Sequence, residues 1–318
     1  MNEDNLQDRG IGIKARYPNL PLSERLRGFL QLTRPFTLVA PMIVVIFGLI
    51  AQMSYAGELH LFWSRIDQIL YVCFTLMIAQ ASGQVSNQAC DPPELDRING
   101  KGYRPIPSGV ISQEEAISIA WIFGTFAIVR AFLTGTQFGM LVLAMMCSII
   151  VYNFEPFRLK KRLWLNNLTM ALSRGLLPFP AVWSVFGELY NPIPWVVGLC
   201  TFLWVLAWQS AKDIDDIKGD AEFGIMTPAV YYGVHKLKKL IVLPSLTSFI
   251  LLAIFIDLGF IPYQLYLLLI LIVPTLCMHK YFGKEKSIDQ LENNIVWQLF
   301  YIVLGGWTIL TAIALTFI

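Results

Sequence analysis

The chain has 318 residues, of which 56% are hydrophobic and only 14% charged, whereas a typical soluble protein has about 25% charged residues. With a mean hydropathy of +0.58 and a formal net charge of only +2, it does not fit nucleic-acid-binding proteins, disordered scaffolds or ordinary cytosolic enzymes. None of its five cysteines forms a C-x-x-C pair, which argues against a disulfide framework and against a zinc or iron–sulfur site.

Residues 1–33 are polar and lack the apolar core of a signal peptide, so we expect a cytoplasmic N-terminal arm with a short interfacial helix at residues 23–32. Apolar stretches of about 20 residues, the length that a spanning helix needs, recur after this arm. We predict nine spans, at residues 36–54, 67–90, 114–133, 137–153, 165–187, 193–211, 239–258, 261–279 and 295–317. The predicted fold is an all-α membrane protein whose residues 34–318 form a single transmembrane domain.

The basic residues orient these spans. With the N-terminus in the cytoplasm, 21 of the 24 lysine and arginine residues fall on the cytoplasmic side, as the positive-inside rule requires. The other three are Arg65, Arg130 and Arg174, and Arg174 lies within the fifth span. We therefore predict a multi-pass membrane protein with its polar loops in the cytoplasm and its C-terminus on the opposite side. Polar residues in the second, fifth and sixth spans indicate that these spans line an interior space.

The first acidic cluster ends the second span and reads Asn87-Gln-Ala-Cys-Asp91-Pro-Pro-Glu94-Leu-Asp96. Asn87 and Asp91 are four residues apart and would share a helix face. Because Pro92 disfavours helical geometry at the residue before it, we expect the span to break at Asp91 and a short helix to restart at Pro92. An alternative is structural: Asp91 would cap the new helix, with Glu94 in the capping-box position. That alternative leaves Asn87 and Asp96 without a role.

The second acidic cluster follows the sixth span. Asp213, Asp216 and Asp220 are spaced as one stripe of a helix, where like charges repel unless a hard cation relieves them. Asp215 would point to another face, and the alternative for the whole cluster is a solvated cytoplasmic loop. Asp91 and Asp216 are 125 residues apart, and each cluster precedes a loop rich in Pro and Gly. This repetition indicates two similar halves that face a shared cavity.

Two acidic clusters on one membrane face indicate a particular chemistry. Mg²⁺ binds few carboxylates and shares its remaining positions with substrate phosphates and water. Two such ions would hold a diphosphate and neutralise the charge that develops as it leaves carbon. The apolar spans around them would hold a hydrocarbon tail, so the predicted substrate is an isoprenoid diphosphate.

Further motifs accompany the acidic clusters in a fixed order. They are Thr33-Arg34-Pro35, Tyr103-Arg-Pro-Ile-Pro-Ser-Gly109, Tyr152-Asn-Phe-Glu-Pro-Phe-Arg-Leu-Lys-Lys161, Arg174-Gly175 and Phe223-Gly-Ile-Met-Thr227. With these motifs, nearly the whole chain resembles the UbiA superfamily of intramembrane prenyltransferases. The resemblance implies a nine-helix bundle around a central cavity that opens to the cytoplasmic side.

The first acidic cluster departs from the family pattern. Family members usually place the second Asp four residues after the first, whereas Asp96 follows Asp91 by five, with two prolines between them. Either Asp96 or Glu94 could therefore reach the metal. We favour Asp96, because the Arg97-Ile-Asn99 that follows it is similar to the family sequence.

The resemblance implies Mg²⁺-dependent ionisation of a prenyl diphosphate, followed by trapping of the allylic cation by an acceptor. It assigns the metals, directly or through water, to Asn87, Asp91, Asp96, Asp216 and Asp220. It makes Asp213 a support for the metals or a base for the acceptor. The candidate diphosphate or substrate partners are Asn87, Arg104, Arg158, Lys160, Arg174 and Lys212. Alternatively, the loop cations serve topology and surface charge, and Arg174 pairs with an acid such as Glu155.

Four functions are compatible with the sequence. The first is transfer of a prenyl group to a lipophilic or aromatic acceptor, such as a quinone precursor. The second keeps the same site with a non-aromatic acceptor, either a prenylated glycerol phosphate or a chlorophyllide-like acid. The third is a UbiA-type terpene cyclase. The fourth, a transporter, would favour charges at mid-membrane, whereas the acids here cluster at span ends. The sequence does not indicate the oligomeric state.

Overall fold

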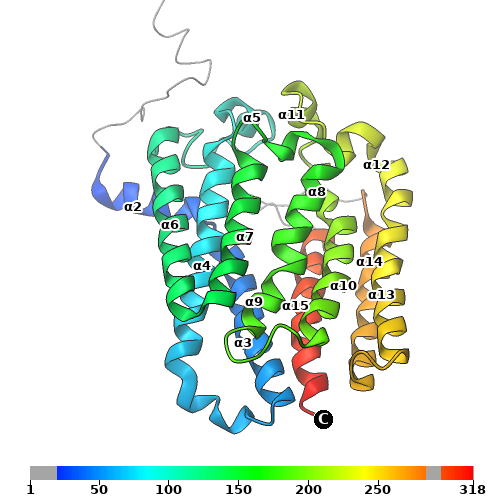
Figure 1. The fold of residues 1–318 in the computed structure, drawn as a ribbon. Helices are drawn as coiled ribbons and strands as arrows, with labels where there is room; N and C mark the ends of the chain where they lie inside the picture. Colours follow the sequence, from blue (N-terminus) through cyan, green and yellow to red (C-terminus); the bar gives the residue numbers. More distant parts are fainter. Residues whose placement is uncertain (1–19, 284–294, 318) are drawn as a thin grey trace, which may run out of the picture.

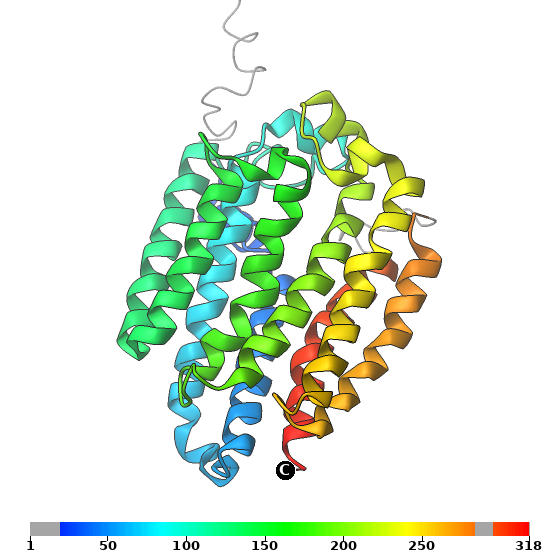
Figure 2. The same cartoon turned by 45° about the vertical axis from the view of Figure 1, so that its right-hand side comes forward.

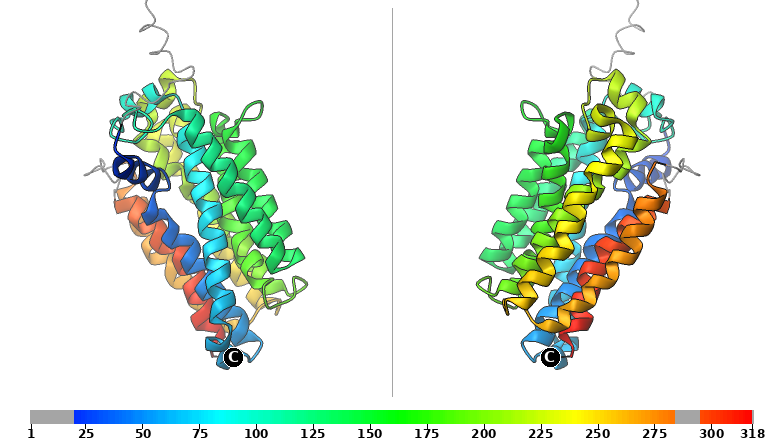
Figure 3. Two further views of the ribbon diagram at one scale, coloured as in Figure 1. Left: turned by 90° about the vertical axis from the view of Figure 1, so that its left-hand side faces the viewer. Right: turned by 90° about the vertical axis from the view of Figure 1, so that its right-hand side faces the viewer.

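The fold is an all-helical bundle. The computed structural model describes residues 20–283 and 295–317, and within these ranges there is no strand, only an isolated backbone bridge between Arg162 and Met226 (Figure 1). The predicted short helix of the N-terminal arm is present as α2 (Leu22–Leu32). Figure 3 shows α2, in dark blue, beside the bundle near one of its ends. Residues 1–19 of the predicted arm lie outside the described residues.

Eight helical segments are long and apolar enough to cross a membrane. They are Pro35–Tyr55, Trp63–Ala89, Gln113–Thr134, Thr136–Asn153, Pro192–Ile214, Pro228–Asp257, Tyr263–Tyr281 and Ile295–Leu315. Their principal helices are α3 (Val39–Tyr55), α4 (Ile66–Ala89), α6 (Gln113–Thr134), α7 (Thr136–Asn153), α10 (Pro192–Trp208), α12 (Pro228–Leu240), α13 (Val242–Asp257), α14 (Ile272–Tyr281) and α15 (Ile295–Leu315). These eight segments correspond to eight of the nine predicted spans.

The predicted fifth span, residues 165–187, is broken into short pieces. These are α8 (Leu163–Ala171), a π-helical segment (Leu172–Leu176) and α9 (Pro178–Trp183). Pro178 and Pro180 lack the backbone N–H that a continuous helix requires, which explains why regular α-helix does not extend through this region. In Figure 1, α8 and α9 follow one another from the upper part of the bundle toward its lower end.

The transmembrane helices form two groups with separate cores. In the first, α4 packs on α6 and α6 on α7, around buried residues such as Val72 and Phe138. In the second, α10 packs on α13 and α14 on α15, around a cluster that includes Trp204 and Trp307. Figure 2 shows the first group in cyan to green and the second in yellow-green to red. The helix α3 packs on both α4 and α15 and so joins the two groups, which means that the helices do not divide simply into a first and a second half of the chain.

Both acidic clusters lie at the same end of the bundle. The short helices α5 (Pro93–Ile98) and α11 (Ile217–Glu222) carry the last acid of each cluster, Asp96 and Asp220, and are in contact there (Figure 1). Asn99, at the end of α5, accepts a hydrogen bond from the backbone N–H of Gly219 at 3.1 Å. A Cβ at position 219 would lie 2.3 Å from the Asn99 side-chain oxygen, so glycine is what permits this close contact.

Candidate active site

The two acidic clusters line one polar pocket, which we call the acidic pocket. Its wall combines carboxylates, cations and amides from segments far apart in the sequence. The carboxylates are Asp91, Asp96, Asp213, Asp216 and Asp220; the cations are Arg34, Lys101, Arg104, Lys160 and Lys212; the amides are Gln84, Asn87, Gln88, Asn99 and Asn166. The structure therefore brings together all five predicted metal-binding residues, the predicted Asp213, and three of the predicted basic residues.

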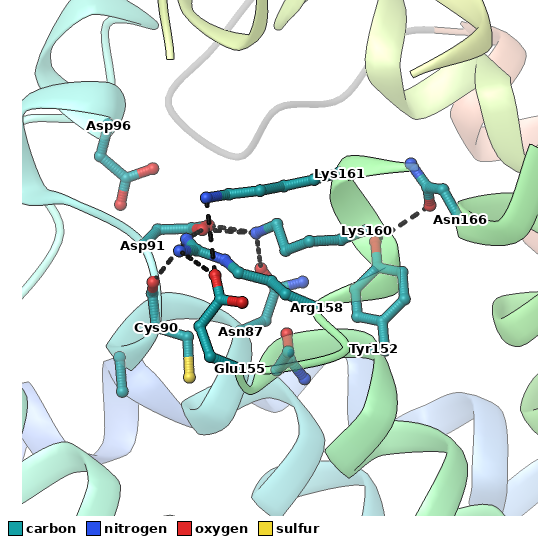
Figure 4. A network of polar contacts seen from close by, with 12 residues as sticks. Asn87, Cys90, Asp91, Asp96, Tyr152, Glu155, Arg158, Lys160, Lys161 and Asn166 are labelled. Carbon is teal, nitrogen blue, oxygen red and sulfur yellow. Dashed lines mark hydrogen bonds and ion pairs between the residues drawn. The ribbon is translucent and has the colours of Figure 1, made fainter. Parts of the chain in front are cut away.

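Asp91 lies just beyond the end of α4 and is the centre of an ion-pair network (Figure 4). The Lys160 ammonium contacts its two carboxylate oxygens at 2.5 and 2.6 Å, and the Arg158 guanidinium lies 3.3 Å from one of them. Burial alone would raise the pKa of Asp91, but the charge and hydrogen bonds of Lys160, together with the charges of Arg158 and Lys212, outweigh it and lower that pKa. The break at Asp91 is confirmed. The capping alternative is wrong, because Pro92 occupies the N-cap of α5 and no side chain caps it.

Asp96, and not Glu94, faces the acidic pocket. Asp96 is buried and accepts a hydrogen bond from the Arg104 guanidinium at 2.8 Å. Burial raises the pKa of Asp96 although the charge of Arg104 opposes the shift. Glu94 instead pairs with Arg97 at 3.3 Å, one turn along the same short helix, and does not line the pocket. The extra residue of this cluster is thus accommodated without moving Asp96 away from the pocket.

Asp213, Asp216 and Asp220 do not lie on the one continuous helix that the sequence predicts. A 3-10 helix covers Gln209–Ile214, and α11 begins only at Ile217. Even so, Asp213, Asp216 and Asp220 all line the acidic pocket, because the break turns them inward, whereas Asp215 is exposed as expected. The solvated-loop alternative is wrong for Asp213 and Asp220, since both are buried.

Electrostatics within the second cluster favour a cation. Asp216 contacts the Lys101 ammonium at 2.5 Å. Asp220 forms no ion pair within the described residues, and burial, with the nearby charges of Asp213 and Asp216, raises its pKa to about 8. A divalent cation would stabilise the ionised form of Asp220 and offset this repulsion.

Sequence reasoning missed two cations of the acidic pocket. Lys101 follows the first acidic cluster, and its ion pair with Asp216 joins the two clusters. Arg34 opens the first span and reaches the same pocket from the N-terminal side. Two signals in the sequence point to them: the position of Lys101 beside the first cluster, and the Arg34-Pro35 motif, which supports the family resemblance.

Two predicted substrate-binding residues lie outside this pocket. Arg158 lies behind Asp91, where it also donates to the backbone oxygen of Cys90 at 2.7 Å. Arg174 lines a second, larger cavity, and the suggested pairing with Glu155 is wrong, because the Glu155 carboxylate lies 3.7 Å from Arg158 and Lys161 instead (Figure 4).

The second cavity, which we call the apolar cavity, adjoins the acidic pocket. Gln84, Asn87 and Tyr152 line both spaces. Most of the remaining wall is apolar and comes from α3, α4, α7 and α15; examples are Val39, Ile43, Leu76, Met145 and Leu304. At the junction, the Tyr152 hydroxyl donates to the Asn166 side-chain oxygen at 3.1 Å (Figure 4). A charged headgroup and an attached hydrocarbon tail could therefore occupy neighbouring compartments.

The donor set of the acidic pocket suits Mg²⁺ that is shared with a phosphate ligand. Carboxylate and amide oxygens are the protein ligands that Mg²⁺ prefers. Within the described ranges, no three acidic, histidine or cysteine side chains are grouped closely enough to hold an ion by themselves. Because Mg²⁺ usually takes one or two carboxylates and completes its shell with substrate phosphates, carboxylates distributed around one pocket fit it better than a closed protein cage would.

Comparison with known proteins agrees with this geometry. The model of the UbiA prenyltransferase family matches residues 42–293. The digeranylgeranylglyceryl phosphate synthase of Methanosphaera stadtmanae is 29% identical over 226 residues, which are 70% of this chain and 75% of that protein. The chloroplastic chlorophyll synthase of Arabidopsis thaliana is 28% identical over 271 residues, 80% of this chain and 67% of that protein. A solved UbiA homologue from Archaeoglobus fulgidus, bound to GPP and Mg²⁺, has the same fold, with a TM-score of 0.67, 18% identity, and coverage of 92% of this chain and 100% of that one.

Proposed function

The chain belongs to the UbiA prenyltransferase family, and on that premise we propose that it transfers a prenyl group from an isoprenoid diphosphate to an acceptor within the membrane. The observation that supports this most strongly is the junction between the acidic pocket and the apolar cavity at Asn87 and Tyr152. A prenyl diphosphate has the same two-part character, and the bond to be broken joins its two parts.

The metal of this reaction is proposed to be Mg²⁺, to which the UbiA homologue from Archaeoglobus fulgidus is bound together with GPP. We assign it to Asn87, Asp91, Asp96, Asp216 and Asp220, with Asp213 in support or as a base for the acceptor. When bound, Mg²⁺ would neutralise negative charge on the departing diphosphate.

The cations of the acidic pocket have a proposed role in binding the diphosphate. In the structure Lys160 contacts Asp91, Arg104 contacts Asp96 and Lys101 contacts Asp216. We propose that these cations, with Lys212, turn to the phosphate oxygens once the carboxylates hold metal. Such an exchange keeps every buried charge paired, which limits the cost of desolvation.

We propose the membrane topology expected for nine spans. The pieces α8 and α9 would complete the ninth crossing, and the acidic pocket would open to the cytoplasm with the C-terminus on the opposite side. The excess of lysine and arginine in the loops on the acidic-pocket side supports this orientation. Residues 34–318 would form one domain.

Two kinds of evidence support a proposal for the acceptor, and they favour different compounds. The sequence motifs favour an aromatic or quinone-precursor acceptor, whereas the named relatives favour a prenylated glycerol phosphate or a chlorophyllide-like acid.

An assay with purified protein, Mg²⁺ and farnesyl or geranylgeranyl diphosphate distinguishes these acceptors. We expect a prenylated product, identified by mass spectrometry, with one of the three acceptors. A cyclised hydrocarbon formed without any acceptor would indicate a cyclase instead, and no turnover of any prenyl diphosphate would contradict the proposal.

The raised pKa of Asp220 predicts how metal binding depends on pH. With a pKa of about 8 in the metal-free protein, this carboxyl carries a proton at pH 7 and must lose it to bind Mg²⁺. The apparent affinity for Mg²⁺ in the presence of diphosphate should therefore rise between about pH 6 and pH 8, with net release of protons. Calorimetry in buffers of different ionisation enthalpy measures that release. Asp220→Asn should make the pH profile flatter, and an unchanged profile would contradict the assignment.

A further inference from the structure

Arg174 is the residue that the proposed chemistry of the acidic pocket leaves unexplained. It is the only charged side chain on the wall of the apolar cavity, as far as the structure describes that wall. No hydrogen bond or ion pair joins it to any other residue in the described ranges. An arginine in a membrane-spanning region is costly unless it is paired or faces a ligand or water-filled space. Arg174 is half-buried on the cavity wall, so its guanidinium is placed to meet a ligand that enters the cavity.

The backbone around Arg174 holds the side chain in this unusual place. Arg174 lies in the π-helical segment Leu172–Leu176, and single π-helical turns are frequent at functional sites. The next residue, Gly175, packs directly on α10: a Cβ there would lie 2.6 Å from the Cα of Phe202. Since only glycine permits this approach, the π-helical turn is fixed against α10.

The side chains near Arg174 offer further polar groups to a ligand. Ser173, Asn153 and Ser148 line the same cavity. Asn153 is buried, and its side-chain oxygen has no hydrogen-bond partner among the described residues. Burying a carbonyl oxygen without a hydrogen-bond partner is unfavourable, and this oxygen is covered by the protein around it.

The prenyl diphosphate does not account for these groups. Its diphosphate would bind the cations of the acidic pocket, and Arg174 is not part of that pocket's wall. Its tail is a hydrocarbon and offers nothing to a guanidinium. The second substrate, the acceptor, must lie close to the bond that breaks, which places it at the junction beside Tyr152 and within the cavity that Arg174 lines.

We propose that Arg174 binds an anionic group of the acceptor, a carboxylate or a phosphate, and thereby selects acceptors that carry an acid. This inference rests on the proposed function and adds the chemical class of its second substrate. The planar guanidinium presents paired N–H donors that match two oxygens of either anion. The low dielectric of the cavity strengthens that pair relative to the same pair in water.

Matched acceptors test this proposal. One pair is 4-hydroxybenzoate and its methyl ester, and the other is geranylgeranylglyceryl phosphate and geranylgeranylglycerol. With the wild-type protein we expect the acid of at least one pair to be preferred, and the preferred pair distinguishes a carboxylate from a phosphate. Equal use of acid and neutral acceptor in both pairs would overturn the proposal, although prenyl transfer itself would stand.

Variants then assign the preference to the arginine. Arg174→Gln should raise KM for the preferred acid by about tenfold to a hundredfold and leave KM for the prenyl diphosphate within about twofold. Arg174→Lys should restore part of the loss. Arg130→Gln is the control, since Arg130 is another arginine within a span, and it donates to Thr75 and to the Tyr71 backbone away from both cavities. Weakened diphosphate binding in Arg174→Gln, or an undiminished preference for the acid, would show that Arg174 does not bind the acceptor.

A binding measurement keeps this test separate from turnover. Binding of the preferred acid to the metal-free protein, measured by calorimetry without prenyl diphosphate, should be lost in Arg174→Gln and kept in Arg130→Gln. If the wild-type protein binds an acid through Arg174 but transfers no prenyl group, the proposed function fails, and an anion site at Arg174 is what remains of this inference. If it transfers prenyl groups but binds no acid, the proposed function stands and this inference fails.

Discussion

Asp216→Asn is expected to lower prenyl transfer by at least about a hundredfold, whereas Asp215→Asn should leave it within about twofold. The two aspartates are neighbours in sequence and differ in orientation: Asp216 lines the acidic pocket and contacts Lys101 at 2.5 Å, and Asp215 is exposed. Asparagine keeps the shape of the side chain but removes the negative charge. Initial rates at saturating Mg²⁺, with product followed by mass spectrometry, measure the difference.

The folded state of both variants must be checked, because Asp216→Asn also removes an ion-pair partner of the buried Lys101. Breaking a buried pair by removing one partner destabilises a protein by about 3–5 kcal/mol. Thermal unfolding in detergent shows whether Asp216→Asn remains folded, and Lys101→Met with Asp216→Asn removes the remaining cation. An active, folded Asp216→Asn protein would refute the metal-site assignment, as would equal losses in the two single variants.

The membrane spans and the acidic clusters could be predicted from the sequence because both depend on local patterns. A run of about 20 apolar residues has few alternatives to a membrane helix, and eight of the nine predicted runs have helical counterparts of sufficient length. The fifth differs because Pro178 and Pro180 interrupt regular helix, an effect that hydropathy does not register. The break at Asp91 was predictable for the same local reason, namely the proline that follows it.

What local patterns do not reveal is which cation meets which acid. Lys101 and Asp216, 115 residues apart, meet because α5 and α11 pack together, with Gly219 in close contact with Asn99. The helical stripe predicted for Asp213, Asp216 and Asp220 failed because tertiary packing outweighs the intrinsic preference of so short a segment. The conclusion that these acids face one pocket survives, because it depends on where α5 and α11 lie.

The second large effect is expected from metal removal: EDTA should reduce prenyl transfer to background, and excess Mg²⁺ should restore it. The protein itself should stay folded, because cations of the chain already contact three of the pocket's carboxylates: Lys160 on Asp91, Arg104 on Asp96 and Lys101 on Asp216. Thermal unfolding with and without EDTA checks this, and we expect transition temperatures that differ by less than about 2 °C.

Because cations of the chain already pair with these three carboxylates, the binding of Mg²⁺ and the binding of a prenyl diphosphate should depend on each other. Mg²⁺ alone must displace an ammonium or guanidinium group from each of these carboxylates and leave it unpaired, so its binding should be weak and should shift the unfolding temperature little. A prenyl diphosphate supplies anionic oxygens to those displaced cations, so the two ligands together should stabilise the fold more than the sum of their separate effects. Tight binding of Mg²⁺ without diphosphate, or turnover that persists in EDTA, would mean that these carboxylates do not serve as a shared magnesium–diphosphate site.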